Sequence, residues 1–182
     1  MRVAHLVPVL LALALPAAAE IEKYAVPSEQ GFCLHWWPKL PAIEGWEQDP
    51  EHSFHYSVNA LVPSGSSFVD ADVVMYAKAV YKPRQPEVTS LSVLIENDSS
   101  DFIKNVPGVK IEEVEPLTTG DGKKLRSLIF TPPASGGNWE QVSYGEEGDF
   151  YLIFTVSSRS AEGFRSARAV YRDLISRYRE KP

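Results

Sequence analysis

The stretch FYLIFTVSSRSAEGFRSARAVYRDLISRYR, residues 150–179, combines two contrasting patterns that decide the fold. Residues 150–156 are almost all apolar, which is typical of a central strand covered on both faces of a sheet. From Ser160, an expected N-cap, apolar residues recur at helical spacing and form one stripe. The stripe consists of Phe164, Ala167, Val170, Tyr171, Leu174, Ile175 and Tyr178. We therefore expect a buried strand followed by a C-terminal amphipathic helix.

Two hairpins are expected immediately before this helix. Residues 109–117 have strand character and are separated from residues 124–131 by Gly120-Asp121-Gly122, a sequence suited to a tight turn. Residues 139–144 are expected to pair in the same way with residues 150–157. Consecutive hairpins require antiparallel pairing, so the sheet should be antiparallel.

The preceding chain supplies further strands and one helix. Residues 73–81 alternate between two faces and predict a strand, and residues 55–61 predict a shorter one. Residues 89–105 change to helical spacing, with Thr89 or Ser90 as the cap. The predicted fold class is α+β: an antiparallel sheet of about five to seven strands, a helix before the two hairpins and a C-terminal amphipathic helix.

The N-terminus has the three-part build of a cleavable secretory signal peptide over residues 1–19. Arg2 provides the positive start, Leu6 to Leu15 the apolar stretch, and small residues precede a cut between Ala19 and Glu20. The apolar stretch is too short to span a bilayer, which takes about 20 residues. We expect an exported protein, periplasmic or extracellular.

The remaining residues, 20–182, are expected to form a single globular domain with an aromatic and proline-rich, irregular N-terminal segment at residues 20–50. The net charge of −6 argues against nucleic acid as a partner. No later apolar run approaches spanning length, so we expect a soluble product with no membrane span after cleavage. Cys33 is the only cysteine and cannot form an internal disulfide. We expect it to be buried, and the alternative is an intermolecular disulfide partner or a reactive thiol.

The order of these elements resembles the PsbP-type fold, shared by exported photosystem accessory proteins, a nuclear Ran-binding protein and bacterial DcrB-like proteins. The resemblance rests on FYLIF at residues 150–154, which continues through SSRS at residues 157–160 into the last helix. It covers about residues 73–179 and contains no functional motif that would transfer site residues. It implies a scaffolding, accessory or chaperone-like role, mostly without catalysis.

The only cysteine and three histidines lie close together in the sequence at Cys33, His35, His52 and His55. Thiolate and imidazole are preferred ligands of Zn²⁺ and Cu²⁺, which makes these four residues candidate metal ligands. The alternative is four unrelated residues that happen to be near in sequence, because a metal site also needs converging geometry.

Three tryptophans, Trp36, Trp37 and Trp46, lie in the same proline-rich segment. Exposed, they would form a platform for a partner or a small ligand, since tryptophan is enriched at interfaces. Buried, they would close the end of the sheet.

No catalytic, phosphate-binding or dinucleotide-binding motif is present, and no cofactor is expected. We therefore favour a non-enzymatic exported domain that binds an envelope or secreted protein partner or a small ligand. The alternative is a secreted hydrolase or metal-binding protein that uses the Cys33, His35, His52 and His55 region. A carboxylate pair such as Asp70 and Asp72 is a further catalytic option, which requires a defined separation across a cleft. The sequence leaves the oligomeric state open.

Overall fold

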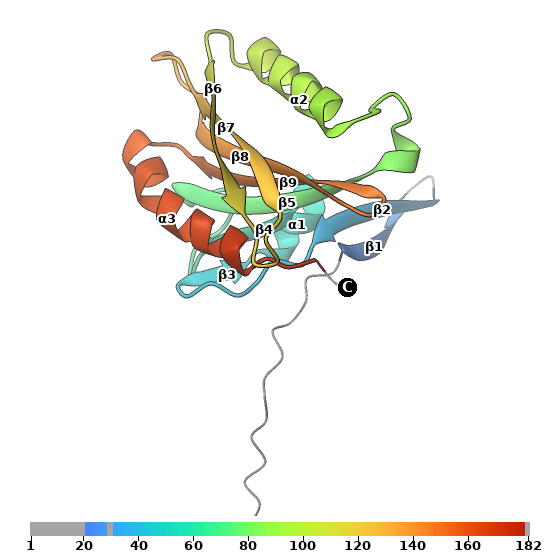
Figure 1. Ribbon diagram of the computed structural model, residues 1–182. Coiled ribbons are helices and arrows are strands. Elements are labelled where there is room, and N and C mark those ends of the chain that lie inside the picture. Colours follow the sequence, from blue (N-terminus) through green and yellow to red (C-terminus); the bar gives the residue numbers. More distant parts are fainter. Residues whose placement is uncertain (1–20, 29–30, 181–182) are drawn as a thin grey trace, which may run out of the picture.

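The computed structural model describes residues 21–28 and 31–180, and Figure 1 shows its course. The signal peptide expected at residues 1–19 and the bond between Ala19 and Glu20 lie outside the described residues. The elements in chain order are β1 (Ile21–Ser28), β2 (Gly31–Pro38), β3 (Trp46–Gln48), α1 (Pro50–Tyr56), β4 (Asn59–Pro63), β5 (Val73–Tyr81), a 3₁₀ turn (Lys82–Arg84), α2 (Leu91–Asn105), β6 (Lys110–Thr118), β7 (Lys124–Thr131), β8 (Trp139–Glu147), β9 (Phe150–Ser158) and α3 (Ala161–Arg177).

Seven strands form one antiparallel sheet in the order β3-β4-β5-β9-β8-β7-β6, and β1 and β2 form a separate two-stranded sheet. Helices α2 and α3 lie on opposite sides of the large sheet (Figure 1). The predicted α+β class is confirmed, with the helix before the two hairpins and the helix after them.

The last strand and helix form the main core, as their sequence pattern predicts. Strand β9 lies between β5 and β8, and its residues 151–158 are all buried. The Ser160 hydroxyl accepts a hydrogen bond from the Gly163 N–H at 3.0 Å and caps α3. The apolar stripe of α3 packs on one sheet face, where Tyr171, Leu174 and Phe154 are at most 1 % exposed.

The opposite sheet face is only partly covered. Helix α2, capped by Ser90, packs Leu94 and Ile95 onto the apolar side chains of β7, β8 and the first half of β9. Among the described residues, α2 contributes no side chain to the apolar cluster at the other end of this face, where β5 begins and β9 ends. There the loop between β4 and β5 turns back and contributes Phe68 and Ala71. Beside this loop, the sheet carries the buried polar side chains Glu140 and Ser157.

Two expectations for the first sixty residues are wrong. The strand predicted from His55 begins instead at Asn59, because residues 50–56 form α1. Asp49 caps this helix and Pro50 occupies its first turn, a helix-start pair that outweighs the weak alternation after it. The aromatic segment is not irregular, since Ile21–Ser28 and Gly31–Pro38 pair as a hairpin that packs beside β5.

Candidate functional site

A pocket of about 260 Å³ opens on the uncovered end of the sheet face that carries α2, and we call it the sheet-face pocket. Strands β5, β8 and β9 provide its floor, and the loop between β4 and β5 provides its wall. Its lining residues are Tyr56, Phe68, Val69, Ala71, Asp72, Val74, Tyr76, Asn138, Glu140, Ser157, Ser158 and Arg159.

Strand register brings the polar floor residues together. Glu140 of β8 lies opposite Ser157 of β9, which in turn lies opposite Val74 of β5. Two residues along the strands, Thr155 lies opposite Tyr76. Because alternate strand residues share a face, these side chains form adjoining rows across three strands.

The carboxyl group of Glu140 is the central polar group of this floor. Glu140 is only 8 % exposed, which is unusual for an ionisable side chain. The Ser157 hydroxyl donates a hydrogen bond to Glu140 Oε1 at 2.8 Å, and Asn138 Nδ2 donates to Ser157 Oγ at 3.1 Å. Within residues 31–180, Ser157 is the only side chain that hydrogen-bonds this carboxyl group. Its second oxygen is thus available to a ligand.

The environment of Glu140 changes its proton affinity. Burial is the largest of the effects that together raise the pKa of Glu140 to about 7. The Ser157 hydrogen bond and Lys78 of β5 lower the pKa, and Asp98 of α2 raises it. Burial, together with Glu140, also raises the pKa of the neighbouring Tyr76 above its ordinary value. The floor therefore holds a carboxyl group that titrates near neutral pH beside a phenol that stays protonated.

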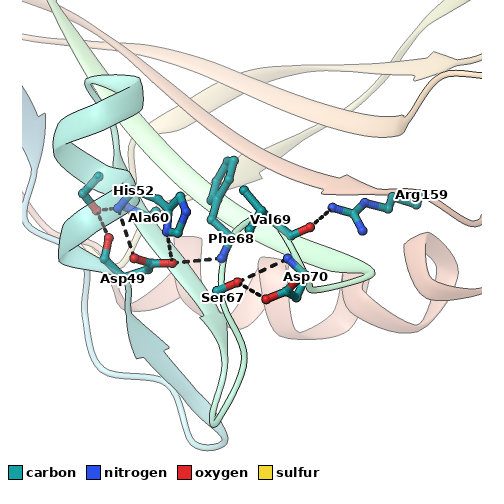
Figure 2. A network of polar contacts seen from close by, with 9 residues as sticks. Asp49, His52, Ala60, Ser67, Phe68, Val69, Asp70 and Arg159 are labelled. Carbon is teal, nitrogen blue, oxygen red and sulfur yellow. Dashed lines mark hydrogen bonds and ion pairs between the residues drawn. The ribbon is translucent and has the colours of Figure 1, made fainter.

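The wall of the pocket is fixed by the buried Asp49, as Figure 2 shows. Its Oδ1 accepts a hydrogen bond from the His52 N–H at 3.1 Å, and its Oδ2 accepts from the Phe68 N–H at 2.9 Å and from His52 Nδ1 at 2.7 Å. Burial raises the pKa of Asp49, but these hydrogen bonds outweigh burial and leave the pKa below its ordinary value. One carboxylate thus joins the start of α1 to the loop that carries Phe68.

Three aromatic rings form a continuous wall from α1 to β5. The centroids of Tyr56 and Phe68 are 5.0 Å apart, and those of Phe68 and Tyr76 are 5.9 Å apart. Tyr56 is 46 % exposed, so its ring lies at the mouth. The pocket is therefore aromatic on one side and carries a carboxyl group on its floor.

Two charged residues lie at the rim. Asp72 Oδ2 accepts a hydrogen bond from Ser160 Oγ at 2.8 Å, beside the N-terminus of α3, where a negative charge is favoured. Arg159 donates to the Val69 carbonyl oxygen and so ties the loop to the end of β9 (Figure 2). The backbone N–H of Arg159 also donates to the Asp72 carbonyl oxygen at 2.9 Å.

The candidate metal ligands divide between separate places. Cys33 and His35 lie on β2 and line another pocket, beside β5, whereas His52 and His55 lie on α1. His35 Nδ1 is 2.9 Å from Ser57 Oγ, and His52 is engaged by Asp49. In the described part of the chain, no three His, Cys, Asp or Glu side chains are grouped so that they could hold a metal ion.

Cys33 is exposed, so the expectation that it is buried is wrong.

The three tryptophans differ in exposure. Trp37 is only 3 % exposed and stacks on Tyr24, so it offers no ring to a partner. Trp36 and Trp46 are half-buried against the main core, and Arg84 lies over the Trp36 ring at 4.8 Å. Any binding role of this segment is thus reduced to Trp36 and Trp46.

The carboxylates considered as a catalytic pair point to different partners. Asp70 accepts from Ser67 Oγ at 2.6 Å and does not line the pocket, whereas Asp72 lies at its rim. Glu140 was missed as a candidate by sequence reasoning. The sequence does contain one indication of this site: Glu140 is an acidic residue at a strand position whose neighbours on the same face, Val142 and Tyr144, are apolar.

Comparison with known proteins gives no further assignment: no protein-family model matches the chain, and no curated protein matches it at a significant level. Among the residues that the structure describes, none of the helices has the length and apolar character needed to cross a membrane.

Proposed function

We propose that this chain is an exported, non-enzymatic binding domain that holds a small ligand in the sheet-face pocket. The observation that carries the proposal is the uncovered end of the sheet face, where Glu140 has a free carboxyl oxygen at the floor of a pocket with a fixed wall. A concave site with few converging polar groups is the usual form of a small-ligand site. The signal-peptide pattern and the resemblance to PsbP-type accessory proteins agree with export and with a binding role.

The lining of the pocket favours binding over catalysis. Ser157 and Ser158 are present, but none of the described residues that line the pocket is a histidine or cysteine that would activate a nucleophile. Cys33 and His35 belong to another pocket.

A hydrolase is the second candidate, because a carboxyl group with a pKa of about 7 suits general acid–base catalysis. It predicts turnover of nitrophenyl glycosides or esters by the wild-type protein and loss of that turnover in Glu140→Gln. Absence of turnover in both proteins supports the binding role.

Thermal unfolding with a panel of small organic cations, organic anions and neutral sugars tests the binding role. We expect at least one class to raise the Tm of the wild-type protein, since a ligand that binds only the folded state stabilises it. Val69→Trp places a larger side chain at the pocket mouth and should abolish the increase. Ile103→Trp is the matched control, because Ile103 is also an exposed apolar residue but lies on α2 outside the pocket. No increase with any class, or an equal increase in Val69→Trp, would contradict the proposal.

A further inference from the structure

We propose that the ligand of the sheet-face pocket is a small organic cation, such as a quaternary ammonium or alkylammonium group, held between Glu140 and the aromatic wall of Tyr56, Phe68 and Tyr76. This inference rests on the proposed binding role of the pocket and specifies its ligand class.

The aromatic wall is the first argument. The face of an aromatic ring attracts a cation through its quadrupole, and several rings around one site are a known means of binding quaternary ammonium groups. Phe68 lies between the two tyrosines, with ring planes at 33° to Tyr56 and 58° to Tyr76. The rings therefore present differently oriented faces and edges, which suits a rounded apolar cation better than a flat ligand.

The carboxyl group of Glu140 is the second argument. It lies at the buried floor, is oriented through Ser157 Oγ and has no cationic hydrogen-bond partner within residues 31–180. Among the described residues, Lys78 of β5 is the one cation that favours the charged form of Glu140, and it does not offset the effect of burial. A buried carboxylate is costly, and a bound cation would reduce that cost. Asp72 adds a second negative charge at the rim.

Arg159 is the only basic residue among the described lining residues, and it is exposed and donates to the Val69 carbonyl oxygen. It therefore lies away from the buried floor. The net charge of the chain, −6, also favours the approach of a cation.

The size of the pocket limits the ligand. A volume of about 260 Å³ is below the range of roughly 300–1,000 Å³ that drug-sized ligands occupy. A choline-sized molecule is thus more suitable than a peptide or an oligosaccharide.

Isothermal titration calorimetry with choline tests the inference, and 3,3-dimethylbutan-1-ol provides a neutral molecule of the same shape. We expect saturable binding of choline and at least about tenfold weaker binding of the neutral analogue, as expected if the charge contributes through the rings and the carboxylate. Glu140→Gln and, separately, Phe68→Leu should each weaken choline binding by about tenfold or more. Phe68→Leu keeps the backbone N–H that bonds Asp49, so it tests the ring while retaining the loop anchor.

Glu146→Gln is the matched control, because Glu146 lies on the same strand but outside the pocket, paired with Lys82. It should bind choline as the wild-type protein does. Equal binding of choline and its neutral analogue, or unchanged binding in both Glu140→Gln and Phe68→Leu, would overturn the inference. If anions or sugars give pocket-dependent stabilisation and choline does not bind, the cation inference fails while the proposed function stands. If nothing binds, both fail.

Discussion

At the scale of single residues, Glu140 at the floor of the pocket and Asp49 behind its wall have opposite roles. Glu140 is a buried carboxyl group with one hydrogen-bond donor, so its charged form is disfavoured. Asp49 accepts three hydrogen bonds, so its charged form is favoured despite burial. Asp49 thus fixes the wall of the pocket, and Glu140 has a carboxyl oxygen that can bind a ligand at the floor.

Glu140 should make the free energy of unfolding fall with rising pH. Below its ordinary pKa of 4.5, Glu140 is protonated in both the folded and the unfolded states. Between pH 4.5 and about 7 the unfolded chain releases the proton while the folded protein keeps it, so stability decreases by up to roughly 3 kcal/mol. Glu140→Gln does not titrate, and its stability relative to wild type should rise over this interval. Urea unfolding of both proteins at pH 4.5 and pH 8 checks this, and parallel pH profiles would exclude it.

The same titration should control ligand binding. Choline affinity should increase about tenfold between pH 6 and pH 8, because the fraction of Glu140 that is ionised rises across its pKa of about 7. The charged groups that act on Glu140 are Asp98 of α2 and Lys78 of β5, and Asp72 and Arg159 lie at the rim of the same pocket. Calorimetric titrations of wild type and Glu140→Gln at both pH values separate the contributions. An increase that persists in the variant would assign the effect to another group.

Asp49→Ala should destabilise the fold by about 1–2 kcal/mol, since it removes the N-cap of α1 and the anchor of the Phe68 loop. Asp70→Ala is the control on the same loop, because Asp70 is exposed and its hydrogen bonds are to the neighbouring Ser67. Denaturant unfolding should show a clear loss for the first variant and less than about 0.5 kcal/mol for the second. Equal losses would mean that Asp49 does not anchor the loop.

At the scale of elements, the two long helices are capped by serines in different surroundings. Ser160 accepts from the Gly163 N–H and also donates to Asp72, whereas Ser90 accepts from the Val93 N–H at 3.3 Å and is exposed. Ser160→Ala should therefore cost about 1–2 kcal/mol, and Ser90→Ala about 0.5–1 kcal/mol. Chemical denaturation of the two variants measures the difference. A larger cost for Ser90→Ala would show that the link between α3 and the rim of the pocket contributes nothing.

The sequence predicts elements well where one pattern dominates. The apolar run of β9, the stripe of α3 and both hairpins follow from local periodicity and turn residues, and all are confirmed. Prediction fails at α1, where a seven-residue helix depends on the Asp49 cap, and at the β1–β2 hairpin, whose proline and tryptophan content masks its strand pattern. In both regions a local feature or a tertiary contact outweighs periodicity.

The site is harder to predict than the fold. Its floor depends on which residues of β5, β8 and β9 lie opposite one another, and its wall depends on a hydrogen bond between Asp49 and Phe68, nineteen positions apart. Neither is visible in local patterns. Cys33 and the three histidines are near in sequence and were therefore candidate metal ligands. The fold places Cys33 and His35 on β2, and His52 and His55 on α1.

At the scale of the whole molecule, the proposed export makes a direct prediction. Protein secreted by a host that recognises the N-terminal signal should begin at Glu20, because the small residues before it suit the signal peptidase. Intact mass spectrometry of the exported protein measures this. A mass that retains Met1 would contradict the proposal of a cleaved signal peptide.

The fold as a whole leaves a pocket at one end of one sheet face, and we propose that the ligand binds there. Amide and side-chain NMR shifts during a choline titration test it most directly. We expect saturable shifts centred on Glu140, Ser157, Phe68 and Tyr76, and no shifts at Cys33, His35 or Trp36 of β2. Shifts centred on β2, or no saturable shifts within the sheet-face pocket, would contradict it.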